Sequence, residues 1–173
     1  MKNIYILFLL VLGFGSSSLF AQRNFNIKSP DGSITVNIEA GAKLLWSVQH
    51  KGQQIIAPSA ISLTLQDGNI LGDNAKITAK TENVETTINT INYVKSVIND
   101  VYNQVTLNCK GNYGVIFRVY DDAIAYRFFT KMPGELIIKN EAANFNFTED
   151  HDAFIPMQWD YRDGKMFNSS FEN

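Results

Sequence analysis

The stretch YGVIFRVYDDAIAYRFF (113–129) decides the fold class, because apolar and polar side chains alternate along its first half with a period of two. Three apolar side chains share the face that is expected to be buried: Val115, Phe117 and Val119. The second half, DAIAYRFF (122–129), is apolar on both faces and predicts a central strand. The pair Asp121–Asp122 separates the halves and is typical of a turn. The stretch therefore predicts an antiparallel hairpin.

The same period of two recurs upstream, in SITVNIE (33–39) and AISLTLQ (60–66). The segment LLWSV (44–48) is apolar on both faces and predicts another central strand. Turn sequences such as SPDGS (29–33) separate these runs. The segment 82–100 is rich in β-branched residues, which favour strands over helices, so it predicts a strand, a turn and a second strand. The chain is therefore expected to form an all-β, antiparallel sandwich.

Residues 1–21 have the composition of a secretory signal peptide. Lys2 supplies the positive start, IYILFLLVLGFG (4–15) supplies the apolar core, and small residues lead to a cleavage point after Ala21. An uncleaved anchor is the alternative, but the apolar run is short for a hydrocarbon layer of about 30 Å. The predicted organisation is a signal peptide, 1–21, followed by one β-sandwich domain, 22–173. No membrane attachment is expected after cleavage.

Composition and charge exclude several classes of protein. Hydrophobic residues make up 45% of the chain and charged residues 18%, which is typical of a globular domain and too apolar for disorder. The formal net charge is −2 and the basic residues are scattered along the sequence, so no nucleic-acid partner is predicted. The single cysteine, Cys109, excludes an internal disulfide and is expected to be a small buried residue rather than a reactive thiol. An exported chain without disulfides fits the periplasm or cell surface of a Gram-negative bacterium.

Two acidic clusters are candidates for chemistry. The segment EDHD (149–152) could bind calcium, but successive side chains of an extended chain point to opposite faces, so a solvated loop is favoured. The pair Asp121–Asp122 could act as paired carboxylates. A hairpin turn is favoured there too, because carboxylates in a tight turn are well solvated and no groove separates their pKa values.

Other candidates are single residues. Arg118 and Arg127 flank the predicted hairpin; each could clamp a ligand, but pairing with a carboxylate at the sheet surface is favoured. His50 precedes a Lys-Gly turn and is expected to be exposed. The tripeptides NFT (146–148) and NSS (168–170) fit the glycosylation pattern, which carries no meaning in a bacterial protein. The residues alone thus predict an exported all-β domain without a complete active site.

Several segments together resemble one family. SPDGSITVNIEAGAKLLWSVQHKGQQIIAPSAISLTL (29–65), GNILG (68–72), VYNQVTL (101–107) and FRVYDDAIAYRFF (117–129) are similar to the N-terminal part of glycoside hydrolase family 97 proteins. The resemblance covers nearly all of residues 27–173. Ala123 stands where that family usually has glycine, which suggests a small local change in the hairpin.

The resemblance implies a fold and an activity. The fold is a β-super-sandwich similar to galactose mutarotase, which is expected to extend beyond residue 173. In the family this domain precedes a (β/α)₈ barrel with the catalytic carboxylates of an α-glucosidase or α-galactosidase that acts on α-linked oligosaccharides. No catalytic residue is therefore expected in this chain, and hydrolysis by the chain alone is not expected.

The resemblance also implies a metal site. The family holds calcium with barrel glutamates and one glutamate of an aromatic-Glu motif, and Phe171-Glu172 sits where that motif is expected. Glu172 is thus a candidate calcium ligand, although one glutamate cannot supply the six to eight oxygens that calcium takes. The alternative is an ordinary surface glutamate.

Two further interpretations stay open. The domain could act alone as a carbohydrate-binding module that stacks sugars on exposed aromatic residues such as Trp159 and Tyr161. It could also be a structural domain without a ligand. Phe145 and Phe147 lie in a polar segment and need other chain to cover them, unless they line a binding face.

Overall fold

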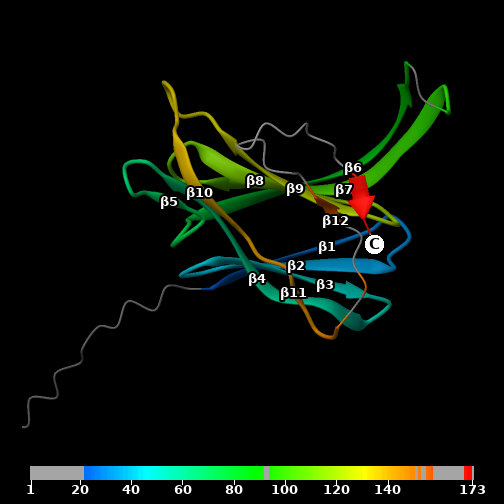
Figure 1. Cartoon of the computed structure of the whole chain (residues 1–173), viewed down its shortest axis with the longest axis horizontal. Helices are drawn as coiled ribbons and strands as arrows, with labels where there is room; N and C mark the ends of the chain where they lie inside the picture. Colours follow the sequence, from blue (N-terminus) through cyan, green and yellow to red (C-terminus); the bar gives the residue numbers. More distant parts are fainter. Residues whose placement is uncertain (1–21, 92–93, 151, 153–154, 158–169, 173) are drawn as a thin grey trace, which may run out of the picture.

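The computed structural model describes residues 22–91, 94–150, 152, 155–157 and 170–172, and every element in them is a β-strand. The described residues contain no helix that is long and apolar enough to cross a bilayer. Two antiparallel sheets face each other (Figure 1). Within each sheet, most neighbouring strands are also consecutive in the chain and are joined by short turns. The predicted all-β, antiparallel fold is confirmed.

The larger sheet has seven strands centred on β4, in the order β1-β2-β3-β4-β10 with β5 and β11 also on β4. Residues Leu45–His50 of β3 pair with the first part of β4, and β5 and β10 flank its last residues. The segment 44–48 is therefore central, as predicted. The bounds are β1 Arg23–Lys28, β2 Ile34–Ala40, β3 Leu44–His50, β4 Gln53–Leu65, β5 Ile70–Leu71, β10 Ile138–Ala143 and β11 Asn146–Phe147.

The second sheet has four strands in the order β6-β7-β8-β9, with β6 Ile77–Asn89, β7 Val97–Cys109, β8 Tyr113–Val119 and β9 Ile124–Thr130. The strands β6 and β7 confirm the strand, turn and strand predicted for 82–100. They pair over their full length, whereas β8 pairs only with Asn103–Cys109 of β7. The remaining part of the β6–β7 hairpin, residues 84–91 and 94–102, projects from the sandwich and is here called the hairpin arm (Figure 1).

The core lies between the two sheets and is built from the predicted inward faces. In β2, β4, β7 and β8 the alternating apolar residues are buried: Ile34, Val36, Ile38, Ile61, Leu63, Leu65, Val105, Leu107, Cys109, Val115, Phe117 and Val119. Phe117 is fully buried and its ring centroid lies 6.3 Å from that of Trp46 on the opposite sheet. The period-two pattern therefore placed each of these side chains on the correct face.

The prediction that DAIAYRFF forms a central strand is wrong. Within the described residues β9 lies at the end of its sheet and pairs with β8, and Ala125 and Arg127 on its outer face are exposed. Phe129 gives this face an apolar residue, and its ring lies over Gly114, the residue opposite it on β8. The ring is so close that a Cβ added to Gly114 would lie 2.5 Å from it. An aromatic side chain covering a strand glycine is a local packing device and does not require a strand on both sides.

A third, small sheet pairs β12 Ile155–Met157 with β13 Ser170–Glu172. Glu172 is opposite Ile155 in this ladder.

Candidate functional site

The pair Asp121–Asp122 forms the predicted turn. The Tyr120 N–H donates to the Ala123 carbonyl at 2.8 Å, which closes the β8–β9 hairpin, and both aspartates are exposed. Asp121 has a structural partner that the sequence did not predict: its carboxylate accepts a hydrogen bond of 2.9 Å from the backbone N–H of Asp31. The turn therefore fastens one sheet to the other.

Arg118 lies in a cluster on the outer face of β7 and β8, and among the described residues no carboxylate pairs with it. Its Nε donates to Gln104 Oε1 at 2.9 Å, and its guanidinium carbon lies 4.4 Å from the centroid of the Tyr102 ring. The Tyr102 and Tyr120 rings are 5.1 Å apart, and the Tyr120 hydroxyl donates to Asp100 at 3.1 Å. Burial raises the pKa of Tyr120. Arg118 is thus already engaged by neighbours within the sheet.

Arg127 borders a shallow hollow of about 190 Å³ beside this cluster. It is exposed, and the one ion pair among the described residues is Lys80–Glu82, so a carboxylate partner for Arg127 is not found there either. His50 ends β3 and is exposed, as predicted. Asn146 of the NFT tripeptide donates from its side chain to the Pro58 carbonyl at 2.9 Å.

A second aromatic cluster lies at the edge of the core. Trp46 packs on Tyr126 with centroids 5.6 Å apart, and Phe145 meets Trp46 edge-on at 5.3 Å and 90°. Phe145 and Phe147, which were predicted to need other chain to cover them, are each 50% exposed. Trp159 and Tyr161, the proposed stacking platforms, lie outside the described residues.

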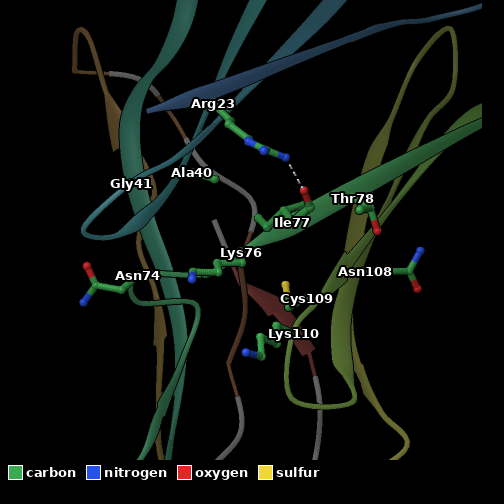
Figure 2. Close-up of a pocket in the computed structure, with 11 residues that line it drawn as sticks. Arg23, Ala40, Gly41, Asn74, Lys76, Ile77, Thr78, Asn108, Cys109 and Lys110 are labelled. Atoms are coloured by element: carbon green, nitrogen blue, oxygen red, sulfur yellow. Dashed lines mark hydrogen bonds between the residues drawn. The ribbon is translucent and has the colours of Figure 1, made fainter. Parts of the chain in front are cut away.

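A cleft of about 590 Å³ opens where the first residues of β1 and β6 meet the last residues of β2 and β7 (Figure 2). Its three cationic residues are Arg23, Lys76 and Lys110, and it is here called the basic cleft. Sequence reasoning missed it because these residues are 53 and 34 positions apart, with no motif around them. The basic residues are scattered along the sequence, but the fold gathers these three on one surface.

Cys109 lies at the wall of the basic cleft and is buried, as predicted. Burial raises the pKa of its thiol to about 11, so the thiolate is disfavoured at neutral pH. The neighbouring Tyr113 hydroxyl accepts a hydrogen bond of 3.2 Å from the Gly72 N–H. Cys109 is therefore a packing residue and not a nucleophile.

The described residues do not by themselves supply a calcium site. No group of three His, Cys, Asp or Glu side chains converges among them. In EDHD, Glu149, Asp150 and Asp152 are exposed, as expected of a solvated loop, and His151 lies outside the described residues. Glu172 is placed by its backbone alone, in β13. A site that used Glu172 would need ligands from elsewhere.

The fold defines the class of the protein, an antiparallel β-sandwich domain. The chain belongs to a glycoside hydrolase family: its residues 27–173 match the family model described as Glycosyl-hydrolase 97 N-terminal.

The relatives are much longer than this chain. It is 36% identical over 177 aligned positions to a retaining alpha-galactosidase of Bacteroides thetaiotaomicron, and the match spans all of the chain but only 26% of that protein. Two solved structures share the fold at 23% identity. One is a glycoside hydrolase family 97 enzyme (E480Q) in complex with panose from Pseudoalteromonas sp. strain K8, with a TM-score of 0.68 over 85% of this chain and 24% of that one. The other is a beta-arabinopyranosidase, with a TM-score of 0.66 over 79% and 24%.

Proposed function

We propose that this chain is the non-catalytic N-terminal portion of an exported, calcium-dependent α-glycosidase, where it packs on a catalytic barrel and helps to form the sugar and calcium site. The supporting observation is the family match over residues 27–173, together with an alpha-galactosidase relative of which the chain spans about a quarter. Residues 1–21 are proposed to direct export to the periplasm or cell surface. The alternative is a stand-alone periplasmic carbohydrate-binding module.

The proposal that the catalytic groups lie in the barrel and not in this chain follows from the chemistry of glycoside hydrolysis. Cleavage requires two carboxyl groups on either side of the glycosidic bond, one as an acid and one as a nucleophile or base. The adjacent pair in this chain, Asp121–Asp122, sits in a solvated turn and is tied to Asp31. The proposed catalytic groups therefore belong to the barrel, and this chain contributes structure and, through Glu172, one calcium ligand.

The hairpin arm is the best candidate for the surface that packs on the barrel. Ile91 and Val94 near its tip are 90% and 97% exposed, and Ile88 and Val97 behind them are each 48% exposed. Single exposed aliphatic residues are ordinary, but four within ten positions on a projecting hairpin form an apolar surface suited to a protein partner.

The proposal is tested by reading the DNA downstream of the codon for Asn173 and by assaying the polypeptides. An in-frame or frameshifted barrel with several glutamates supports the proposal, whereas an unrelated gene contradicts it. The longer polypeptide is expected to release sugar from p-nitrophenyl α-glucoside or α-galactoside and to lose activity with EDTA, while the present chain is expected to release none. Activity of the present chain alone would overturn the assignment of catalysis to the barrel.

The role of Glu172 has its own test in the longer polypeptide. Glu172→Gln removes one charged oxygen ligand and is expected to raise the calcium concentration for half-maximal activity at least ~10-fold. Glu149→Gln, in the exposed EDHD loop, is the matched control and is expected to leave it unchanged. Isothermal titration of the present chain with maltose and melibiose tests the alternative, which predicts binding heat at millimolar sugar.

A further inference from the structure

The basic cleft is held together by two hydrogen bonds between distant parts of the chain, one from a side chain and one within the backbone. The Arg23 guanidinium donates through Nη1 to the Ile77 carbonyl at 2.8 Å, which draws the start of β1 against the start of β6. The Lys110 N–H donates to the Lys76 carbonyl at 2.9 Å, which fixes the two lysines side by side at the base of the β6–β7 hairpin. These two hydrogen bonds bring three cationic residues from distant parts of the chain to one cleft.

The electrostatics of the basic cleft are one-sided. Its lining contains Arg23, Lys76 and Lys110 and, among the described residues, no carboxylate. Of two nearby acids in sequence, Glu39 accepts a hydrogen bond from the Gln22 amide at 2.8 Å, and neither Glu39 nor Asp73 lines the cleft. Figure 2 shows the Lys76 and Lys110 side chains extending in a similar direction, with Arg23 reaching across from β1. Cations gathered in a concave site raise the local concentration of anions.

The rest of the lining supplies two further features. Small and apolar residues form part of the wall: Ala40, Gly41, Ala75, Ile77 and Cys109. Polar side chains with hydrogen-bond donors stand around it: Asn74, Thr78 and Asn108. A volume of about 590 Å³ is within the range of small-molecule sites and is far larger than one inorganic anion.

We propose that the basic cleft is a binding site for a small hydroxylated organic anion, of the class of a sugar acid. Its carboxylate lies near Lys76 and Lys110, its hydroxyl groups meet the amide and hydroxyl side chains, and its carbon skeleton covers the apolar wall. Arg23 keeps its contact with Ile77 and adds charge-assisted hydrogen bonds from its free guanidinium edge. Glu172 is not among the lining residues, and the proposal does not depend on the proposed glycosidase function.

Isothermal titration of the full chain tests this proposal, with glucuronate, glucose and sulfate as probes at low ionic strength. Glucuronate is expected to bind at about millimolar Kd and at least ~10-fold more tightly than glucose or sulfate. Lys76→Gln/Lys110→Gln is expected to weaken glucuronate binding at least ~10-fold. The matched control, Lys131→Gln/Lys139→Gln, removes the same charge from exposed lysines outside the cleft and is expected to change affinity less than ~2-fold.

The proposal would be overturned by no heat with glucuronate at about 20 mM, by equal affinity for glucuronate and glucose, or by equal weakening in both double variants. Equal affinity for sulfate and glucuronate would also overturn it, because the apolar wall and the polar side chains would then contribute nothing. Circular dichroism checks that each variant is folded. If the double variant unfolds, the single variants Lys76→Gln and Lys110→Gln carry the test, each with an expected loss of ~3-fold or more.

Discussion

The Asp121 carboxylate accepts a hydrogen bond of 2.9 Å from the backbone N–H of Asp31, although the two residues are 90 positions apart. Asp31 itself accepts hydrogen bonds from the Ser29 hydroxyl at 2.5 Å and from the Ser33 N–H at 2.9 Å. The backbone N–H of Asp31, in the turn between β1 and β2, is therefore joined to the carboxylate of Asp121, in the turn between β8 and β9.

Asp31→Asn is expected to reduce the pH dependence of stability. The Ser29 hydroxyl, followed by the Ser33 N–H, lowers the pKa of Asp31 from 3.8 to about 2. A pKa lowered by folding gives stability that is complete above pH 3.8 and is lost as the pH falls toward 2. The difference in Tm between the wild-type chain and Asp31→Asn should thus be largest above about pH 4 and shrink toward pH 2.

Thermal unfolding followed by circular dichroism across this pH range measures the effect. Asp122→Asn is the control, because it removes the same charge from the adjacent turn without touching the Ser29 and Ser33 contacts. Its effect on Tm should be smaller than that of Asp31→Asn, because the Ser29 and Ser33 contacts stay intact. A Tm difference for Asp31→Asn that stays constant down to pH 2 would contradict the linkage.

Gly114→Ala is expected to destabilise the second sheet strongly. An added Cβ would lie 2.3 Å from the Leu107 carbonyl oxygen and 2.5 Å from Phe129 Cζ. The Phe129 ring can turn away, but the Leu107 carbonyl belongs to the neighbouring strand and cannot move without breaking the ladder. We expect a loss of about 2–3 kcal/mol in the free energy of unfolding, measured with urea.

Gly41→Ala is the matched control for this prediction. Its added Cβ would meet only Gln22 Cγ, at 4.0 Å, so the change should stay within about 0.5 kcal/mol. The double variant Gly114→Ala/Phe129→Leu should recover little, since the carbonyl contact remains. Full recovery in the double variant would show that the ring and not the backbone causes the loss.

The sequence predicted the fold well because one face of each central strand is buried, so the period of two is strongly selected. Val115, Phe117 and Val119 are each at 0% exposure on β8. The prediction failed for β9, where an aromatic residue covers Gly114 and imitates a second buried face. The pattern of apolar residues in a strand indicates which faces are covered. It does not indicate whether another strand or a single side chain covers them.

The candidate surfaces could be predicted less well than the fold. Arg118 was singled out, but its partners Gln104 and Tyr102 lie on another strand, at a register that the sequence does not reveal. The basic cleft depends on contacts between residues more than 30 positions apart, such as Lys110 to Lys76. The interpretation of Glu172 came from family resemblance and stays a prediction.

Removal of the Phe117 ring is expected to lower the free energy of unfolding far more than removal of the apolar side chains at the tip of the hairpin arm. Phe117 is fully buried against Trp46 and Tyr126, so Phe117→Ala should lower the free energy of unfolding by about 3–5 kcal/mol. Ile91→Ser/Val94→Ser replaces side chains that are 90% and 97% exposed and should change it by less than about 0.5 kcal/mol.

Urea unfolding followed by tryptophan fluorescence measures both variants. If the hairpin arm packs on a barrel, Ile91→Ser/Val94→Ser should weaken that association in the longer polypeptide while leaving the present chain stable. A large loss of stability in the present chain would instead mean that the tip is packed within the domain, which would contradict its role as a free docking surface.

The Cys109 thiol is expected to react slowly in the folded chain. Burial raises its pKa from 9.0 to about 11, so near pH 8.5 the reactive thiolate should be ~100-fold rarer than in the unfolded chain. A pKa raised by folding gives stability that is complete below pH 9 and is lost as the pH rises toward 11. The rate of labelling by neutral iodoacetamide, with and without concentrated guanidinium chloride, measures the difference.

The position of Cys109 beside the basic cleft makes a second reagent informative. An anionic thiol reagent such as iodoacetate should be attracted by Arg23, Lys76 and Lys110, so its rate in the folded chain relative to iodoacetamide should fall with added salt. Cys109→Ala should abolish labelling by both reagents. Equal rates in the folded and unfolded chain would show that the thiol is open to solvent, because a buried thiol must wait for the cleft wall to open before either reagent reaches the sulfur.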